Sequence, residues 1–161
     1  MNIQRIMVIG AGQMGAGIAQ VCAVAGFDVV LHDIQSEVVE RGLKSIEQQF
    51  QKKVEKGRFS VEEKLDVCQR IKPSVDLADA CSVDLVIEAV VEKVEVKTSL
   101  FQKLDQLVGS DTILATNTSS LPITEIAAVT KRPEKVIGMH FMNPVPVMKL
   151  VENHPRTSNS R

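Results

Sequence analysis

The sequence RIMVIGAGQMG, residues 5–15, decides the fold. Four consecutive apolar residues, 6–9, predict a strand that is covered on both faces, as in a parallel sheet. Apolar residues then recur at helical spacing as far as Gly26, where a helix C-cap is expected. A second apolar run, residues 29–31, leads directly to His32 and Asp33. The segment therefore predicts a strand, a helix and a second strand within about 30 residues, which is a βαβ unit.

The glycines of this segment form a GxGxxG motif between the first strand and the helix. Glycine allows the tight turn and lets the backbone approach a pyrophosphate, whose charge then lies at the helix N-terminus. Asp33 follows about 20 residues later, where a carboxylate accepts hydrogen bonds from a ribose and repels a 2′-phosphate. A bare GxGxxG is a weak signal and an aspartate at a strand end is often only solvated, but the flanking elements favour a dinucleotide site. We predict NAD rather than NADP as the cofactor, bound by Gly10, Gly12, Gln13, Met14, Gly15 and Asp33.

Segments of helical and strand character alternate along the rest of the chain. We expect helices at 36–56, 62–68, 94–108 and 121–129, and strands at 83–87, 112–115 and 136–139. This alternation predicts an α/β fold of Rossmann type, a doubly wound and mostly parallel sheet with helices on both faces. We expect residues 1–152 to form this single domain and residues 153–161 to form a polar, disordered tail.

Composition argues against several classes of function. Of 161 residues, 44% are hydrophobic and 24% charged, and the net charge of −1 offers no excess of positive charge for nucleic acid. The three cysteines, Cys22, Cys68 and Cys81, lack the spacing of a metal site. No apolar run approaches the ~20 residues of a membrane span, and no signal segment opens the chain. We expect a cytoplasmic protein with no metal, nucleic-acid or membrane partner.

Two motifs in the second half are distinctive: NTSSL at 117–121 and GMHFMNPVPVMKLVE at 138–152. Together with the glycine loop they resemble the 3-hydroxyacyl-CoA dehydrogenase family, above all its bacterial 3-hydroxybutyryl-CoA dehydrogenases. The resemblance extends from the glycine loop to Glu152. It implies an NAD-dependent oxidoreductase of fatty acid and butanoate metabolism, whose substrate is a short 3-hydroxyacyl-CoA and whose product is the 3-oxoacyl-CoA, or the reverse.

The resemblance also implies catalytic roles. His140 matches the base that takes the hydroxyl proton, a task for which an imidazole is well suited near pH 7. Glu152 matches the carboxylate that orients the ring, and Ser119 matches the serine that hydrogen-bonds the reacting oxygen. A histidine after an apolar strand is more often structural than catalytic, so the motif around His140 carries this assignment.

Further positions are implied to bind cofactor or substrate. Glu92, Lys97 and Asn143 match positions that line the nicotinamide side of the pocket, together with Ser119. Lys56 matches a basic position near the CoA phosphates, and Ser119 is again implied to contact the substrate. The neighbouring pair at positions 52 and 53 adds positive charge, although adjacent lysines on a helix are usually a solvated face.

Members of the family continue after the glutamate with a largely helical domain, which carries most of the homodimer contact and closes over the substrate. Here Glu152 is followed by NHPRTSNSR, so we expect this domain to be missing, the activity to be impaired and the oligomeric state to be open. Two hypotheses remain: an enzyme of this type, and a catalytically silent NAD-binding module or regulatory fragment. The HFMNP motif disfavours a third, a Rossmann dehydrogenase for another hydroxy acid.

Overall fold

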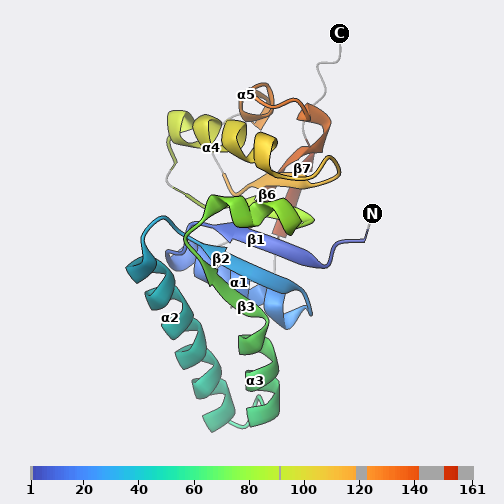
Figure 1. Cartoon of the computed structure of the whole chain (residues 1–161). Helices are drawn as coiled ribbons and strands as arrows, with labels where there is room; N and C mark the ends of the chain where they lie inside the picture. The colour runs from blue at the N-terminus through green and yellow to red at the C-terminus, as the bar shows by residue number, and fades with distance from the viewer. Residues whose placement is uncertain (1, 91, 119–122, 142–150, 156–161) are drawn as a thin grey trace.

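The computed structural model describes residues 2–90, 92–118, 123–141 and 151–155, in which a seven-stranded sheet forms the centre (Figure 1). Its strand order is β3-β2-β1-β4-β5-β6-β7. The first six strands are parallel, and β7 runs antiparallel to β6. The strands are β1 Arg5–Ile9, β2 Asp28–His32, β3 Ile71–Ser74, β4 Leu85–Glu88, β5 Ile113–Thr116, β6 Val136–Phe141 and β7 Val151–Pro155.

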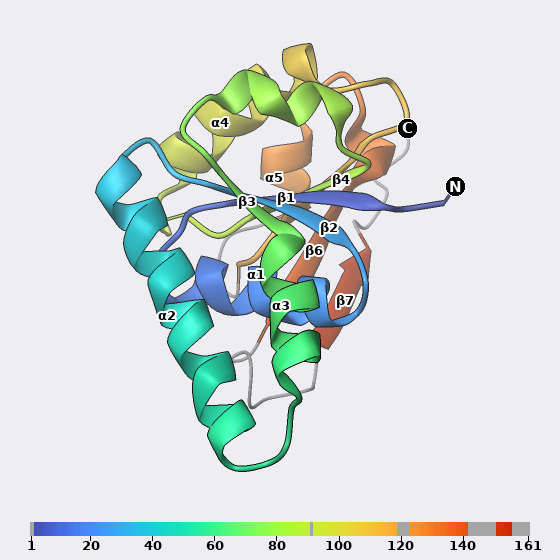
Figure 2. The ribbon, with the colours of Figure 1, turned by 60° about the horizontal axis from the view of Figure 1, so that its bottom comes forward.

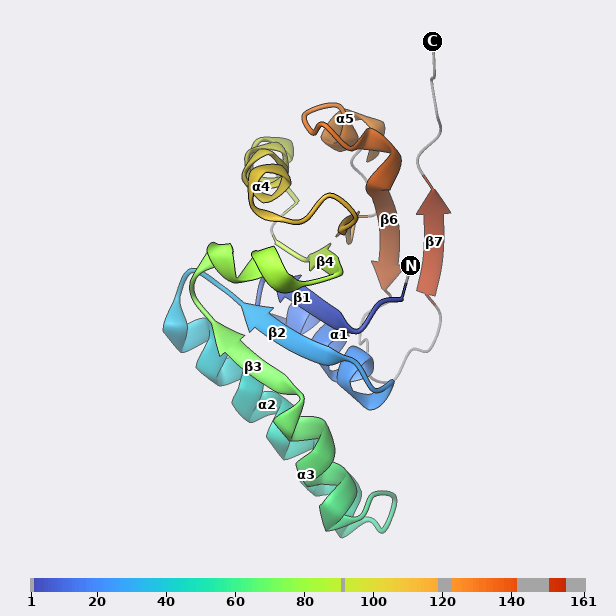
Figure 3. The same cartoon turned by 45° about the vertical axis from the view of Figure 1, so that its right-hand side comes forward.

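Helices cover both faces of the sheet, as the alternating pattern predicted. The α-helices are α1 Gln13–Val24, α2 Ser36–Glu55, α3 Val61–Gln69, α4 Val94–Leu107 and α5 Ile123–Ala127, and the 3₁₀ turns are η1 Leu77–Ser82 and η2 Pro133–Lys135. Figure 3 shows α1, α2 and α3 on one side of the sheet and α4 and α5 on the other. The predicted doubly wound Rossmann-type fold is therefore confirmed. Among the described residues, no helix is both long and apolar enough to span a membrane.

Strand β1 shows why the sheet is buried on both faces. Ile6 and Val8 belong to the core on the α1 side, whereas Met7 and Ile9 belong to the core on the α4 side. All four side chains are at most 3% exposed. Each such side chain contributes about 1.5–3 kcal/mol on burial, which explains the unbroken apolar run in the sequence.

Helices α2 and α3 form a hairpin that projects beyond the sheet (Figure 2). The 20 residues of α2 span about 30 Å. At the turn, Ser60 caps α3: its hydroxyl accepts from the Glu63 amide at 3.0 Å, and the Glu63 carboxylate accepts from the Ser60 amide at 2.9 Å. The rings of Phe50 in α2 and Phe59, which precedes Ser60, stack with their centroids 5.2 Å apart. The turn between the two predicted helices is thus an ordered cap.

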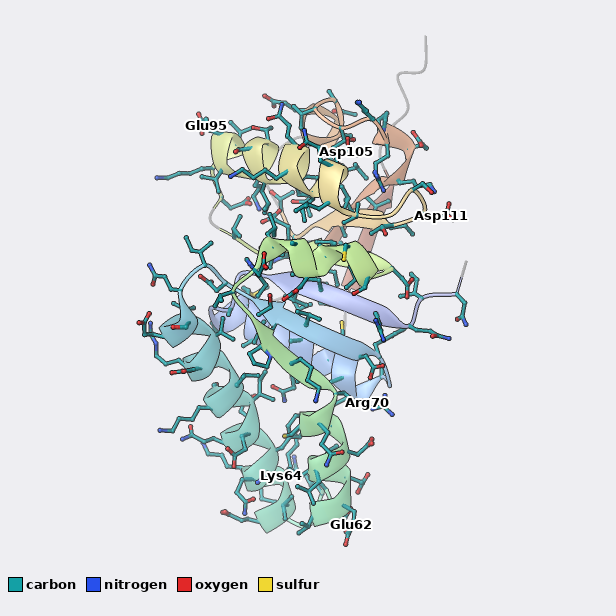
Figure 4. The ribbon with its side chains drawn as sticks, viewed as in Figure 1. Glu62, Lys64, Arg70, Glu95, Asp105 and Asp111 are labelled. Carbon is teal, nitrogen blue, oxygen red and sulfur yellow. The ribbon has the colours of Figure 1, made fainter. Side chains whose placement is uncertain are left out.

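The far end of α4 is fixed to the following elements by a second set of polar contacts. Arg132 Nε lies 2.7 Å from Asp105 Oδ1, and both side chains are largely buried. Arg132 also donates to the carbonyl oxygens of Gly109 and Thr112, just before β5. Figure 4 shows Asp105 near the end of α4 that lies away from Glu95. This ion pair holds the C-terminal half of α4 against β5 and η2.

Two strands, one at each edge of the sheet, were not predicted from the sequence. The sheet gains β3 at its edge, which pattern analysis did not predict because Lys72 and Pro73 interrupt its apolar character. Proline is tolerated there because an edge strand leaves one row of backbone donors unpaired. At the other edge β7 continues to Pro155, three residues into the expected tail, because pairing with β6 provides backbone partners. Residues 156–161 of that tail lie outside the described residues.

The start of α1 packs directly on the glycine loop. A Cβ atom at Gly15 would lie 1.5 Å from the Gly10 carbonyl oxygen, which is impossible without backbone movement. At Gly42 of α2, a Cβ atom would lie 3.0 Å from the Ala11 carbonyl oxygen. Two glycines therefore let two helices approach the same loop.

We predict that Gly15→Ala lowers the free energy of unfolding by about 3 kcal/mol or more, because backbone atoms on both sides must move. Urea denaturation at neutral pH measures the change. Gly109→Ala is the matched control, since a Cβ atom there would have its nearest neighbour at 3.7 Å. Equal stability of the two variants would contradict the prediction.

Candidate functional site

The glycine loop is tied to the end of β2 by backbone and side-chain hydrogen bonds. Gly10 has a positive φ of 101° and donates its amide to the His32 carbonyl oxygen at 2.8 Å. Asp33 accepts from the Ala11 amide at 3.0 Å through Oδ2 and from the Gln35 amide at 3.2 Å through Oδ1. Each carboxylate oxygen has a further lone pair. Asp33 therefore supports the loop and still has capacity to accept from a ribose.

The N-terminus of α1 has the features of an anion site. Gly12 is the N-cap, no side chain caps the helix, and no acidic residue lies in its first turn. Gly12 and Gln13 are exposed, Met14 is half-buried, and a Cβ atom at Gly12 would meet no heavy atom within 4 Å. Protein packing thus gives no reason for glycine at position 12. Open space beside unpaired helix amides fits a pyrophosphate.

His32, the last residue of β2, is buried. Its side chain is 2% exposed, and neither ring nitrogen has a hydrogen-bond partner. Burial lowers the pKa of His32 below its ordinary value, although the carboxylates of Asp33, Asp79 and Asp76 oppose that shift. The ring is therefore neutral at pH 7 and packs in the protein interior.

A buried ion pair occupies the carboxyl end of β4. Lys97 Nζ lies 2.5 Å from Glu88 Oε2, and both side chains are fully buried. Glu88 accepts two more hydrogen bonds, from the Val90 amide at 2.7 Å and from the Thr116 hydroxyl at 2.6 Å. Such a pair is tolerated in an interior only when its remaining polar atoms are satisfied. It joins β4, β5 and α4 at one point.

This network continues to the surface through Glu92. Lys97 Nζ lies 3.1 Å from Glu92 Oε1, and the Thr118 hydroxyl donates to Glu92 Oε2 at 2.8 Å. The Glu92 side chain is 41% exposed, whereas that of Lys97 has no exposed area. The resemblance implied that Lys97 lines the nicotinamide side of the pocket. Its ammonium lies between two carboxylates, and Glu92 is the member of the network that reaches the surface.

The two distinctive motifs of the second half meet at the same edge of the sheet. Asn117, which follows β5, accepts from the Phe141 amide at 3.0 Å through its side-chain oxygen. Its own amide donates to the Glu88 carbonyl oxygen at 2.8 Å. The NTSSL and HFMNP motifs are therefore linked to each other and to β4.

The proposed catalytic pair lies on the last two strands. His140 of β6 is half-buried, and its register partner in β7 is Glu152. The two positions, 12 apart in sequence, are thus directly opposite each other. The other two predicted positions in these motifs, Ser119 and Asn143, lie outside the described residues.

Lys56 lies at a different place from the residues described above. It is the C-cap of α2 at the exposed tip of the hairpin, about 20 Å along α2 from Gly42, which packs on the glycine loop. Lys52 is exposed, and the Lys53 ammonium lies 5.1 Å from the Phe50 ring centroid and 5.8 Å from that of Phe59. Lys53 is thus engaged with aromatic rings, and Lys56 is at the solvent-facing turn.

Other features of the described residues contribute nothing to this site. A cavity of about 350 Å³ between α2 and α3 is lined by apolar residues, Glu47 and Lys64, and includes none of the predicted positions. In the described part of the chain, no group of three or more His, Cys, Asp or Glu side chains could hold a metal.

Four residues of this part of the site have no role predicted from the sequence. They are Glu88, Thr116, Asn117 and Thr118. One local signal was available for Glu88: a carboxylate directly after a buried apolar strand is costly unless it is paired. Its two side-chain partners come from positions 9 and 28 residues further on, so the sequence alone did not identify them.

We predict that Thr116→Val destabilises the protein by about 1.5–3 kcal/mol, because a buried carboxylate loses a donor. Thr112→Val is the matched control: this buried hydroxyl donates at 2.9 Å to the neutral Val83 carbonyl oxygen, so its loss should cost about 1 kcal/mol. Thermal and urea unfolding measure both. A control variant as unstable as Thr116→Val would show that the charge of Glu88 is irrelevant to this bond.

Comparison with known proteins agrees with this geometry. Residues 5–161 match the family described as 3-hydroxyacyl-CoA dehydrogenase, NAD binding domain. A probable 3-hydroxybutyryl-CoA dehydrogenase of Bacillus subtilis is 56% identical over 152 residues, which are 94% of this chain and 53% of that protein. A 3-hydroxyadipyl-CoA dehydrogenase of Escherichia coli is 46% identical over 151 residues, 94% of this chain and 32% of that protein.

Solved structures give the same result. The crystal structure of (S)-3-hydroxybutyryl-CoA dehydrogenase PaaH1 from Ralstonia eutropha superposes with a TM-score of 0.93 at 41% identity, covering 99% of this chain and 57% of that one. The chain spans about half the length of the first curated relatives it matches. The resemblance found in the sequence is confirmed, and so is NAD as the cofactor. This chain belongs to the NAD-binding domain family of the 3-hydroxyacyl-CoA dehydrogenases.

Proposed function

We propose that this chain provides the cofactor half of an NAD-dependent dehydrogenase that interconverts short 3-hydroxyacyl-CoA and 3-oxoacyl-CoA. The observation that carries the proposal is the register of β6 and β7, in which His140 and Glu152 are direct partners. Both positions belong to the motif that Asn117 joins to β4, because its side-chain oxygen accepts from Phe141 and its backbone amide donates to Glu88. The proposal is also supported by the relatives, which are named as 3-hydroxybutyryl-CoA dehydrogenases.

The glycine loop and Asp33 would hold the cofactor. The amides at the start of α1 would bind the pyrophosphate beside Gly12, and Asp33 would accept from the adenosine ribose. Gln13, Met14 and the other two glycines complete this part of the site. Bound NAD supplies the hydride acceptor of the reaction. Glu92, Lys97, Ser119 and Asn143 are proposed for the nicotinamide side, with Lys97 acting through Glu92.

The chain itself would move the proton. As the hydride leaves C3 of the substrate with both electrons of the C–H bond, the hydroxyl proton passes to His140 and the C–O bond becomes a carbonyl. Glu152 would accept a hydrogen bond from the other ring nitrogen and stabilise the imidazolium. Ser119 would hydrogen-bond the reacting oxygen. Lys56, with its exposed ammonium on the hairpin, would contact the CoA phosphates.

The alternative function is an NAD-binding module without turnover. It is favoured by one observation: the family model that matches residues 5–161 describes an NAD binding domain. The two hypotheses agree on NAD binding and differ in catalysis. We further propose a cytoplasmic location, in line with these metabolic relatives.

For the cofactor site, we predict that Gly12→Ala leaves stability nearly unchanged but weakens NADH binding at least tenfold. The methyl group would enter the open space where the pyrophosphate approaches the helix amides. Fluorescence titration with NADH and urea denaturation measure the two effects, and Gly109→Ala is again the control. Unaltered NADH affinity in Gly12→Ala would contradict this placement of the pyrophosphate.

For catalysis, we predict NADH oxidation that depends on acetoacetyl-CoA. His140→Gln should lower kcat by a factor of about 100 or more with NADH affinity unchanged, because a proton donor is lost. His154→Gln, two positions beyond Glu152 in β7, is the matched control. NADH binding without any turnover would favour the silent module, and turnover that survives in His140→Gln would exclude the histidine as base.

A further inference from the structure

Three side chains at the carboxyl ends of β4 and β5 form a fixed group of charges. Glu88 and Lys97 are fully buried and Glu92 is 41% exposed, so two carboxylates share one ammonium. The net charge of the three is −1. Hydrogen bonds from the Val90 amide and the hydroxyls of Thr116 and Thr118 hold the carboxylates in place.

The Lys97 ammonium is held in place because both ends of α4 are fixed. Lys97 lies in the first turns of α4, whose other end is held by the buried Arg132–Asp105 pair. The three charged side chains therefore cannot change position as the side chains of exposed surface residues do. Their field is therefore nearly constant, and it is less screened than that of exposed groups. Since burying an ion pair rarely adds stability over apolar packing, a functional reason for this pair is reasonable.

The place of the cluster in the sheet gives that reason. In this sheet the strand order reverses between β1 and β4, and dinucleotides bind across the carboxyl ends of the strands at such a point. Asp33 at the end of β2 marks the adenosine side. The other half of the dinucleotide must then extend past β1 toward β4 and β5, where Glu88 and Thr116 are the last strand residues. The nicotinamide ring carries a positive charge when oxidised and none when reduced.

We propose that Glu88, Lys97 and Glu92 act together as a fixed charge of −1 that strengthens binding of NAD⁺ relative to NADH. This inference rests on the proposed function and adds to it the relative affinity of the site for NAD⁺ and NADH. Glu88 and Lys97 are positioning residues in this scheme: they place and hold the charge, and Glu92 presents it at the surface.

The test compares dissociation constants for both cofactor forms, using NADH fluorescence titration and its displacement by NAD⁺. Glu88→Gln and Glu92→Gln each change the charge of the cluster from −1 to 0. A unit charge acting across about 10 Å at an effective dielectric constant of about 20 alters a binding constant roughly tenfold. We therefore expect the ratio Kd(NADH)/Kd(NAD⁺) to fall about tenfold in both variants.

Two further variants separate charge from structure. Glu88→Gln combined with Lys97→Met removes the ion pair but keeps the net charge at −1, and we expect the ratio to stay within about twofold of the unaltered chain. Asp33→Asn, on the adenosine side, should weaken both cofactor forms by the same factor and leave the ratio unchanged. A purely structural role for Glu88 would instead affect NAD⁺ and NADH equally.

The outcomes are decisive in each case. If the ratio Kd(NADH)/Kd(NAD⁺) of Glu92→Gln stays within twofold of that of the unaltered chain, the inference is wrong. It is also wrong if the ratio of the double variant falls as far as that of Glu88→Gln. If Glu88→Gln fails to fold, Glu92→Gln decides alone, because its partly exposed side chain is not needed for the core. An unaltered chain that binds neither cofactor would refute the proposed function itself, which is a different result.

Discussion

The absence of a side chain at Gly15 is the constraint on which the cofactor half depends. Any larger residue would place its Cβ atom inside van der Waals contact with the Gly10 carbonyl, so α1 could not begin beside β1. Once α1 is there, its amides lie at the edge of the sheet, and Gly42 lets α2 approach the same loop. The position of Asp33, which binds the Ala11 amide, follows from this packing.

At the ends of β4 and β5, beyond the point where the strand order reverses, the structure depends on a buried carboxylate and not on close backbone contact. The apolar strands β4 and β5 each end in a polar residue, Glu88 and Thr116, and these are bonded to each other. Asn117 then links the end of β5 to the backbone of β6. The edge at β1 and β2 thus depends on glycines, and the edge at β4 and β5 depends on a buried carboxylate whose oxygens are all hydrogen-bonded.

The sequence predicted what depends on neighbouring residues and missed what depends on distant ones. The first strand, first helix and second strand were predicted because periodicity and the glycines are local signals. Strand β3 was missed because Lys72 and Pro73 conceal an edge strand that only pairing with β2 stabilises. The resemblance identified Lys97, but its burial between two carboxylates results from tertiary packing that no local pattern encodes.

The double attachment of Asp33 limits how this domain can change its cofactor. Replacing the aspartate with a small neutral residue is the obvious first step toward accepting a 2′-phosphate, but it would also leave the Ala11 amide without its acceptor. Selectivity for the ribose and the conformation of the glycine loop therefore both depend on the Asp33 carboxylate. A lineage that moved toward NADP would need a compensating change in the loop before, or together with, the loss of the carboxylate.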